Sequence, residues 1–264
     1  MLALIAGQGS LPTRIASRVP QWPIIAAVEG FPPDELIPEF TFSFANLGTL
    51  LQHLRARDVK TVCFAGAVDR PPLDVCKVDA ATAPLMPQLL KINCLGDDGA
   101  LRVVMTVFEQ AGFEIISASD LLSDVTTSVG ILTKATPDEM AYDGAAKGVR
   151  TLYALSDLDI GQSCVIAKSQ VIAIETLPGT DWMLKTLVNV EAANRGVLVK
   201  LPKRGQDRRV DMPTIGPMTI ENAHAAGLSG VVIASDGTMI VDAQDTIDTA
   251  NRYGLFLMAM QVDE

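Results

Sequence analysis

The chain has 264 residues, of which 48% are hydrophobic and 20% are charged, a composition typical of a folded globular protein rather than a disordered one. Its length allows one large domain or two of ordinary size. The formal net charge of −10 argues against nucleic acid as a partner, because binding to nucleic acid needs a broad basic surface. No apolar run reaches the roughly 20 residues of a membrane-spanning helix, so we expect a soluble protein whose contact with membrane lipid is peripheral.

The four cysteines lack C-x-x-C spacing, and the chain has two histidines. This pattern argues against a zinc site, and unpaired thiols suit a reducing, cytoplasmic location. The N-terminal segment MLALIAGQGS is apolar but has no basic n-region. It is therefore interpreted as a first strand and not as a signal peptide.

The first half of the chain predicts strands and helices joined by glycine turns. An apolar strand at Leu2–Ala6 runs into the turn Gly7-Gln8-Gly9-Ser10, and a helix follows over Thr13–Val19. This arrangement points free backbone N–H groups toward a phosphate or a sugar. Pro12 stands where a dinucleotide fingerprint has its third glycine, so the motif indicates NAD binding only weakly. A tight turn that only lets the helix pack on the sheet is the alternative.

Further strands are expected in this half at Ile24–Val28, Thr61–Ala65 and Phe113–Ile116, with helices over Asn46–Arg57 and Ala100–Ala111. Because the carboxyl ends of strands in an open α/β sheet face one crevice, we expect Gly9, Ser10 and Asp69 to meet there. Asp97 and Asp98 are interpreted as caps that stabilise the start of a helix.

The second half predicts a different kind of sheet, after a polar and β-branched link at Ser123–Ser128. Thr180 is expected to cap a helix over Trp182–Val190, where the helix start offers a second anion site. The other elements expected here are a helix from Thr136 to about Leu155, a hairpin of Ser163–Lys168 with Val171–Glu175, a second hairpin of Val231–Ala234 with Met239–Val241, a helix from Pro217 toward Gly227, a helix between Asp242 and Gly254, and a strand over Leu255–Met260.

The run KLPKRGQDRRVDMPT, from Lys200 to Thr214, follows a short apolar strand at Val197–Val199 and is the most informative stretch. Its prolines and Gly205 disfavour a regular helix and favour a shaped loop. Five of the chain's 21 cations lie in it, which reverses the sign of charge locally and suits an anionic ligand. Asp207 and Asp211 lie among these cations, and carboxylates hold the hard divalent ions that bridge phosphates. A charged surface loop without a ligand is the alternative.

Three longer segments carry a family resemblance. LALIAGQGSLP, DIGQSCVIAKSQVIAIETLPGTDWM and VLVKLPKRGQDRRVDMPTIGPMTI, with FAGAVDRP and the Gly-Asp-Asp before the long helix, resemble the UDP-2,3-diacylglucosamine pyrophosphatases of the LpxI type. The resemblance covers nearly the whole chain. It implies an α/β protein with an N-terminal Rossmann-like domain (residues 1–123), a linker (124–132) and a C-terminal α/β catalytic domain with a mixed sheet (133–264), with the substrate held between the domains.

The resemblance implies Mg²⁺-dependent hydrolysis of UDP-2,3-diacylglucosamine to UMP and 2,3-diacylglucosamine 1-phosphate (lipid X), a step of lipid A biosynthesis. Family precedent also implies a homodimer, and we expect it to work peripherally at the cytoplasmic face of the inner membrane. The resemblance places the catalytic aspartate at Asp211. The substrate-contacting positions that it implies are Gly9, Ser10, Asp69, Asp159, Ser163 and Thr180.

The chemistry of pyrophosphate cleavage adds further candidates, because the leaving phosphate is poor unless its charge is neutralised. Lys200 and Asp207 are expected to support catalysis beside Asp211, and Mg²⁺ is expected on Asp211 with Glu175 or Asp207. The further residues expected to bind substrate are Lys203, Gln206, Arg208, Arg209 and Thr214.

Two other functions compete with hydrolysis. A nicotinamide-dependent oxidoreductase fits the first half, but Pro12 interrupts its fingerprint and His224 is interpreted as a helix-end histidine rather than a base. A non-catalytic nucleotide-sugar sensor would keep the cations yet would not need Asp211 beside them. Binding without turnover in Mg²⁺ would identify the sensor.

Overall fold

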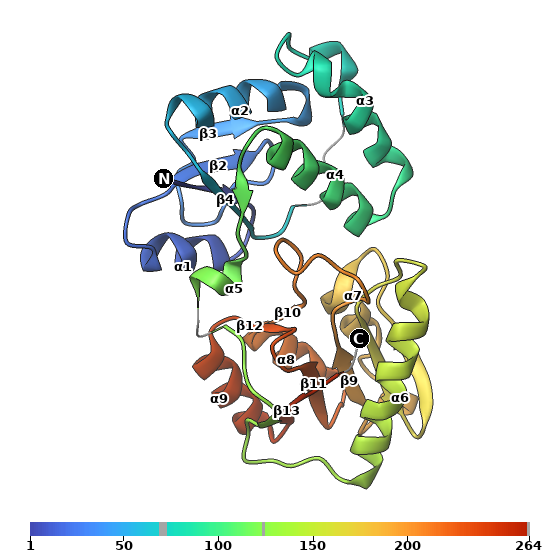
Figure 1. The fold of residues 1–264 in the computed structure, drawn as a ribbon. Helices are drawn as coiled ribbons and strands as arrows, with labels where there is room; N and C mark the ends of the chain where they lie inside the picture. Colours follow the sequence, from blue (N-terminus) through green and yellow to red (C-terminus); the bar gives the residue numbers. More distant parts are fainter. Residues whose placement is uncertain (69–72, 123–124, 263–264) are drawn as a thin grey trace. The chain divides into compact units, whose positions relative to one another are not determined.

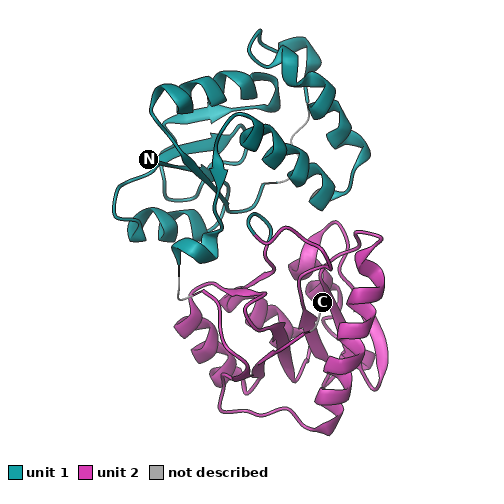
Figure 2. Cartoon of the chain, in the orientation of Figure 1, with its two compact units in different colours: residues 1–123, 209–211 teal, residues 124–208, 212–264 magenta. Residues whose placement is uncertain are grey.

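The structure is a computed structural model that describes residues 1–68, 73–122 and 125–262. The chain divides into two compact units (Figure 2). Unit 1 comprises Met1–Ser123 and Arg209–Asp211, and unit 2 comprises Asp124–Arg208 and Met212–Glu264. Each unit has its own hydrophobic core.

Unit 1 is built on a five-stranded parallel sheet with the order β3-β2-β1-β4-β5 (Figure 1). Its strands are β1 (Leu2–Ala6), β2 (Ile24–Val28), β3 (Phe40–Phe42), β4 (Thr61–Ala65) and β5 (Glu114–Ile115). β1 is central and β2 is buried along its whole length. Strands covered on both faces need continuous apolar runs, which is what LALIA and IIAAV supply. The strand order is that of a Rossmann-like domain.

The helices of unit 1 cover both faces of this sheet. α2 (Leu47–Ala56) and α4 (Asp97–Gln110) pack on one face, where Leu54 and Phe108 are fully buried in the core. α1 (Leu11–Arg18) and α5 (Ala118–Leu121) lie on the other face (Figure 1). The remaining helical turns are α3 (Met86–Leu89), η1 (Phe44–Asn46), η2 (Val75–Lys77), η3 (Ala83–Leu85) and η4 (Leu90–Cys94).

Unit 2 is built on a six-stranded mixed sheet with the order β6-β13-β11-β9-β7-β8. Its strands are β6 (Gly130–Ile131), β7 (Ser163–Ala167), β8 (Gln170–Ile174), β9 (Val197–Lys200), β11 (Gly230–Ala234) and β13 (Phe256–Met260). β9, β11 and β13 are parallel, whereas β6, β7 and β8 run antiparallel to their neighbours. The α/β class, with one parallel and one mixed sheet, is confirmed.

The long helix α6 (Glu139–Ser156) covers one face of this sheet. The opposite face carries α7 (Gly179–Thr186), α8 (Pro217–Ala225) and α9 (Ala243–Tyr253). A 3₁₀ turn, η5 (Glu191–Ala193), and a two-stranded parallel sheet of β10 (Thr214–Ile215) and β12 (Met239–Ile240) complete the unit. No helix among the described residues is long and apolar enough to cross a membrane.

The second hairpin expected from the sequence is wrong. β11 pairs in parallel with β9 and β13, which occupy both of its edges, and β12 pairs instead with β10. The Ser-Asp-Gly-Thr turn that suggested a hairpin is tied to the sheet by Thr238. The Thr238 hydroxyl accepts from the Ala234 N–H at 3.3 Å and donates to the Lys200 carbonyl at 3.4 Å.

Two glycines of α6 provide a matched test of how closely this helix packs. A Cβ at Gly148 would lie 2.5 Å from Val199 Cγ2, whereas one at Gly144 would lie 3.7 Å from its nearest neighbours, at ordinary contact distance. We predict that Gly148→Ala lowers the free energy of unfolding by about 1–3 kcal/mol through overpacking. Gly144→Ala is predicted to raise it by about 0.5–1 kcal/mol, because alanine favours the helix. Urea unfolding followed by circular dichroism measures both, and equal effects would contradict the packing.

The four cysteines divide into two buried and two exposed thiols. Burial raises the pKa of the Cys63 and Cys164 thiols to about 12. Since the thiolate is the reactive species, we predict that a thiol reagent at pH 8 labels Cys76 and Cys94 quickly in the native protein. Cys63 and Cys164 are predicted to react only after unfolding. Mass spectrometry of the labelled peptides tests this, and rapid native labelling of Cys164 would show that the core of unit 2 is open.

Candidate functional site

The topology of unit 2 collects polar side chains from three strands at one edge of its sheet. β9 ends at Lys200, and the antiparallel β7 begins at Ser163, which is the register partner of Lys200. β8 runs antiparallel to β7, and just beyond its end the Glu175 N–H donates to the Ser163 carbonyl at 2.9 Å. Three residues that are far apart in the sequence therefore lie side by side.

Lys200 carries a buried ammonium group at this edge. The residue is 7% exposed, and its Nζ donates to Thr180 Oγ1 at 2.8 Å. Among the described residues, Thr180 is the one side chain that accepts from this ammonium. Because an ammonium has three N–H donors, Lys200 keeps donors for an anionic ligand.

Glu175 is the acceptor on which the neighbouring hydroxyls converge. Its Oε2 accepts from Ser163 Oγ at 2.7 Å, from Thr180 Oγ1 at 3.0 Å and from the Gln162 N–H at 3.4 Å. Such donors allow a carboxylate to remain in a site that is only 8% exposed. Gly161 permits the backbone before β7 to approach Glu175 closely, since a Cβ at this position would lie 2.1 Å from the Glu175 carbonyl oxygen.

The sequence assigned Thr180 to a helix cap, and that interpretation is wrong. α7 begins at Gly179 with Pro178 at the N-cap position, and no side chain caps it. The Thr180 hydroxyl bridges Lys200 and Glu175 instead. A buried carboxylate and a buried ammonium compete for this hydroxyl more strongly than a neutral backbone N–H does.

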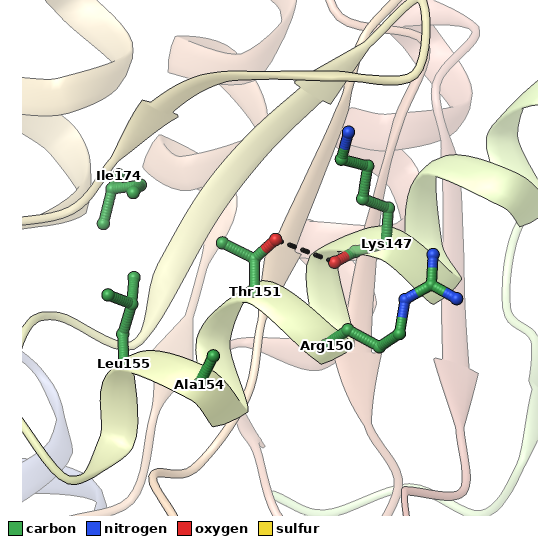
Figure 3. Close-up of a pocket in the computed structure, with 6 residues that line it drawn as sticks. All are labelled: Lys147, Arg150, Thr151, Ala154, Leu155 and Ile174. Carbon is green, nitrogen blue, oxygen red and sulfur yellow. Dashed lines mark hydrogen bonds between the residues drawn. The ribbon is translucent and has the colours of Figure 1, made fainter.

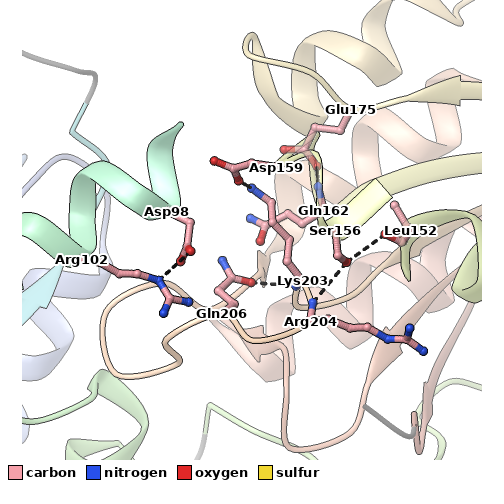
Figure 4. A network of polar contacts seen from close by, with 10 residues as sticks. All are labelled: Asp98, Arg102, Leu152, Ser156, Asp159, Gln162, Glu175, Lys203, Arg204 and Gln206. Atoms are coloured by element: carbon pink, nitrogen blue, oxygen red, sulfur yellow. Dashed lines mark hydrogen bonds and ion pairs between the residues drawn. The ribbon is translucent and has the colours of Figure 1, made fainter. Parts of the chain in front are cut away.

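A second polar group surrounds Lys203, in the loop after β9 (Figure 4). Its ammonium forms an ion pair with Asp159, and both side chains are largely buried. The Lys203 N–H donates to Gln206 Oε1 at 2.8 Å. The Arg204 guanidinium lies 4.4 Å from the centre of the Tyr153 ring. These contacts give the loop a fixed, non-helical shape, as the prolines and glycine predicted.

Gln162 is a polar residue of this region that sequence reasoning did not assign. Its Oε1 is buried and has no hydrogen-bond partner among the described residues, although its backbone N–H and C=O are used. Figure 4 draws Gln162 beside Asp159 and Lys203. The sequence signal that could have identified Gln162 is its position directly before β7, within the family-like segment that begins DIGQSC.

Unit 1 holds the glycine turn. Gly7 and Gln8 donate backbone hydrogen bonds to Ala65 and Ala67 at 2.8 and 2.9 Å, which fix the turn against the end of β4. Gly9 has φ +96° with open space around it, and Ser10 at the N-cap of α1 makes no side-chain cap. The turn is therefore open at its tip. Asp69, which was expected beside it, lies outside the described residues.

Three residues of the loop that follows β9, Arg209–Asp211, belong to unit 1. Arg209 forms an ion pair with Glu109 of α4 at 2.8 Å, and Val210 packs against the core of unit 1. Asp211 completes this short segment. The predicted residues thus divide by unit. Unit 1 carries Gly9, Ser10, Arg209 and Asp211, and unit 2 carries Asp159, Ser163, Glu175, Thr180, Lys200, Lys203, Gln206, Asp207, Arg208 and Thr214.

The acidic residues that the sequence predicted as Mg²⁺ ligands come from both units. No group of three or more His, Cys, Asp or Glu side chains among the described residues could hold a metal ion. Glu175, which was predicted as a metal ligand, uses Oε2 to accept hydrogen bonds from two hydroxyls. Mg²⁺ commonly uses one or two carboxylates together with waters and phosphate oxygens, and Asp211 satisfies that lesser requirement.

A shallow hollow of about 410 Å³ lies elsewhere on unit 2 (Figure 3). It is formed by the outer side of α6 and by Ile174 of β8. Leu155 and Ile174 supply apolar surface, and Lys147 and Arg150 supply positive charge. The hollow thus combines apolar and cationic chemistry.

Comparisons with known proteins identify the family. The LpxI N-terminal domain model matches residues 1–125, and the LpxI C-terminal domain model matches residues 128–258. The chain is also 34% identical over 275 residues to the UDP-2,3-diacylglucosamine pyrophosphatase LpxI of Caulobacter vibrioides, with 100% of this chain and 98% of that protein covered. The chain belongs to the LpxI family.

Proposed function

We propose that this protein is a pyrophosphate hydrolase that cleaves UDP-2,3-diacylglucosamine to UMP and 2,3-diacylglucosamine 1-phosphate, in lipid A biosynthesis. Its membership of the LpxI family and the name of its Caulobacter relative support a diphosphatase activity. The observation that carries the proposal is the buried Lys200 ammonium, which keeps N–H donors for an anion. Pyrophosphate oxygens carry the opposite charge and accept hydrogen bonds, so they suit that donor.

The two lysines of unit 2 have separate tasks in this proposal. Lys200 binds a phosphate oxygen at the sheet edge and stabilises the charge that develops on the leaving phosphate. Lys203 is held by Asp159, which keeps its ammonium at a fixed position while the ion pair remains partly accessible. Arg208 and Asp207, both half-buried in the same loop, extend this polar surface.

Asp211 is proposed as the catalytic carboxylate, which orients the attacking water. Arg209 and Val210 hold the backbone just before it, so its position is set by the α4 ion pair and by packing. Mg²⁺, when bound through Asp211 and the substrate phosphates, would neutralise phosphate charge and lower the pKa of a bound water. Gly9 and Ser10 are proposed to bind the substrate through free backbone N–H groups at the start of α1.

The first test is UMP release from UDP-2,3-diacylglucosamine by the purified protein, with Mg²⁺ and with EDTA. We predict Mg²⁺-dependent release that falls by about 10²–10³ in Asp211→Ala, because an electrostatic or orienting group at the reaction centre has been removed. Asp245→Ala, which changes an exposed carboxylate of α9, serves as the control and is expected to behave as wild type.

Two results would overturn parts of the proposal. Activity of Asp211→Ala within about tenfold of wild type, a barrier change of roughly 1.4 kcal/mol, would remove Asp211 from the reaction centre. Binding of the UDP-sugar without any UMP release in Mg²⁺ would identify a nucleotide-sugar sensor instead of a hydrolase.

We also propose that the protein forms a homodimer and works peripherally at the cytoplasmic face of the inner membrane. The diacyl substrate resides in lipid, and the hollow on α6 combines the apolar and cationic groups that suit an anionic lipid surface. Size-exclusion chromatography with light scattering tests the dimer.

Sedimentation with vesicles tests the membrane contact. We predict that vesicles with anionic phospholipid retain the protein and that Arg150→Glu weakens retention by about tenfold, since each basic residue near such a surface contributes about 1 kcal/mol and reversal adds repulsion. Arg252→Glu, an equal charge reversal on α9, is the control and is expected to sediment as wild type. Equal retention of the Arg150 and Arg252 variants would exclude the hollow as the contact surface.

A further inference from the structure

We infer that Thr180 and Glu175 are positioning residues that fix the Lys200 ammonium for a phosphate oxygen, and that they act through Lys200 rather than by touching substrate or metal. The inference deepens the proposed function and rests on it for the identity of the anion. It changes the expected role of two residues, since the sequence assigned Glu175 to Mg²⁺ and Thr180 to substrate contact.

The direction of each hydrogen bond follows from the chemistry of the donors. An ammonium only donates, so the Thr180 oxygen accepts from Lys200 at 2.8 Å. The single Thr180 hydroxyl hydrogen is then available to Glu175 Oε2, at 3.0 Å. Ser163 donates its own hydrogen to the same oxygen at 2.7 Å, which is shorter than its 3.4 Å contact with Thr180. The charges are thus linked in one order, from Lys200 through Thr180 to Glu175.

Because the three residues are buried, losing any hydrogen bond between them is costly. Lys200, Thr180 and Glu175 are 7%, 7% and 8% exposed, so water cannot replace a lost partner at low cost. A lysine side chain has a flexible stem of four carbons, so its ammonium takes a fixed position only through the groups that it contacts. Thr180 is the one described side chain that provides such a contact. Without its hydroxyl, the ammonium is not held at the sheet edge.

The backbone around the link is equally constrained. Ser163 is paired in register with Lys200, and the Glu175 N–H donates to the Ser163 carbonyl. The Lys200 carbonyl accepts from the Thr238 hydroxyl. Lys200 and Glu175 are therefore both held at the ends of paired strands. Such a rigid backbone is expected where residues position one functional group.

A double-mutant cycle on anion binding tests the inference, with inorganic pyrophosphate as the probe and calorimetry of the full chain as the measurement. Thr180→Val replaces the hydroxyl by a methyl, and we expect it to weaken pyrophosphate binding by about tenfold, as for loss of a charge-assisted hydrogen bond. Thr180→Ser keeps the hydroxyl and is expected to restore most of the affinity. Lys200→Met is expected to weaken binding by at least as much as Thr180→Val.

The decisive comparison is Thr180→Val in the Lys200→Met background. If Thr180 acts through Lys200, the second substitution changes affinity by less than about twofold there, because the coupled pair is non-additive. A loss of about tenfold in both backgrounds would overturn the inference, as would wild-type affinity in Thr180→Val alone. Thr180→Ala removes the same hydroxyl and replaces the valine variant in the cycle if that variant is unstable.

The cycle is independent of turnover, so the two proposals fail separately. A non-additive cycle with no UMP release supports the positioning of Lys200 and contradicts the hydrolase. UMP release with an additive cycle supports the hydrolase and contradicts the positioning role. Absence of pyrophosphate binding in the wild-type chain would overturn the inference outright.

Discussion

The burial of a lysine ammonium at the end of β9 is the constraint on which the organisation of unit 2 depends. An unpaired charge in such a place costs several kcal/mol, and a nearby carboxylate offsets part of that cost when hydrogen bonds stabilise the charge of the carboxylate itself. Thr180, Ser163 and the Gln162 N–H meet that condition around Glu175. The same hydrogen bonds require a glycine at position 161, because a side chain there would push residues 159–162 away from the end of β8.

The loop between β9 and β10 is one short segment with residues in both units. Its first residues after β9 are fixed on unit 2 by the Lys203–Asp159 ion pair and by the contact of Arg204 with Tyr153. Arg209–Asp211 belong to unit 1, where Val210 packs against the core. Pro202, Gly205 and Pro213 disfavour a regular helix in this loop. Lys203 and Arg204 are therefore anchored on unit 2, whereas Arg209 and Asp211 belong to unit 1.

The sequence predicted elements best where local and tertiary preferences agree. The apolar runs at Leu2–Ala6, Ile24–Val28 and Thr61–Ala65 are strands with those bounds, because strands buried on both faces leave no ambiguity of pattern. The pairing of the segments on either side of the Ser-Asp-Gly-Thr turn was predicted wrongly, because a turn sequence does not reveal that both edges of β11 are already paired. The short strands β3, β6 and β10 were missed, since two or three residues carry too little periodicity.

The candidate site illustrates a stricter limit. Residue types and a family resemblance were sufficient to select Ser163, Glu175, Thr180 and Lys200, yet they did not indicate how these four act together. Strand direction brings the four residues together, because β7 begins where β8 and β9 end. Hydrogen-bond polarity then orders their contacts, since an ammonium only donates and a carboxylate only accepts, so the hydroxyl between them accepts from Lys200 and donates to Glu175. Glu175, which the sequence suggested as a metal ligand, accepts in this arrangement from the same hydroxyl that accepts from Lys200.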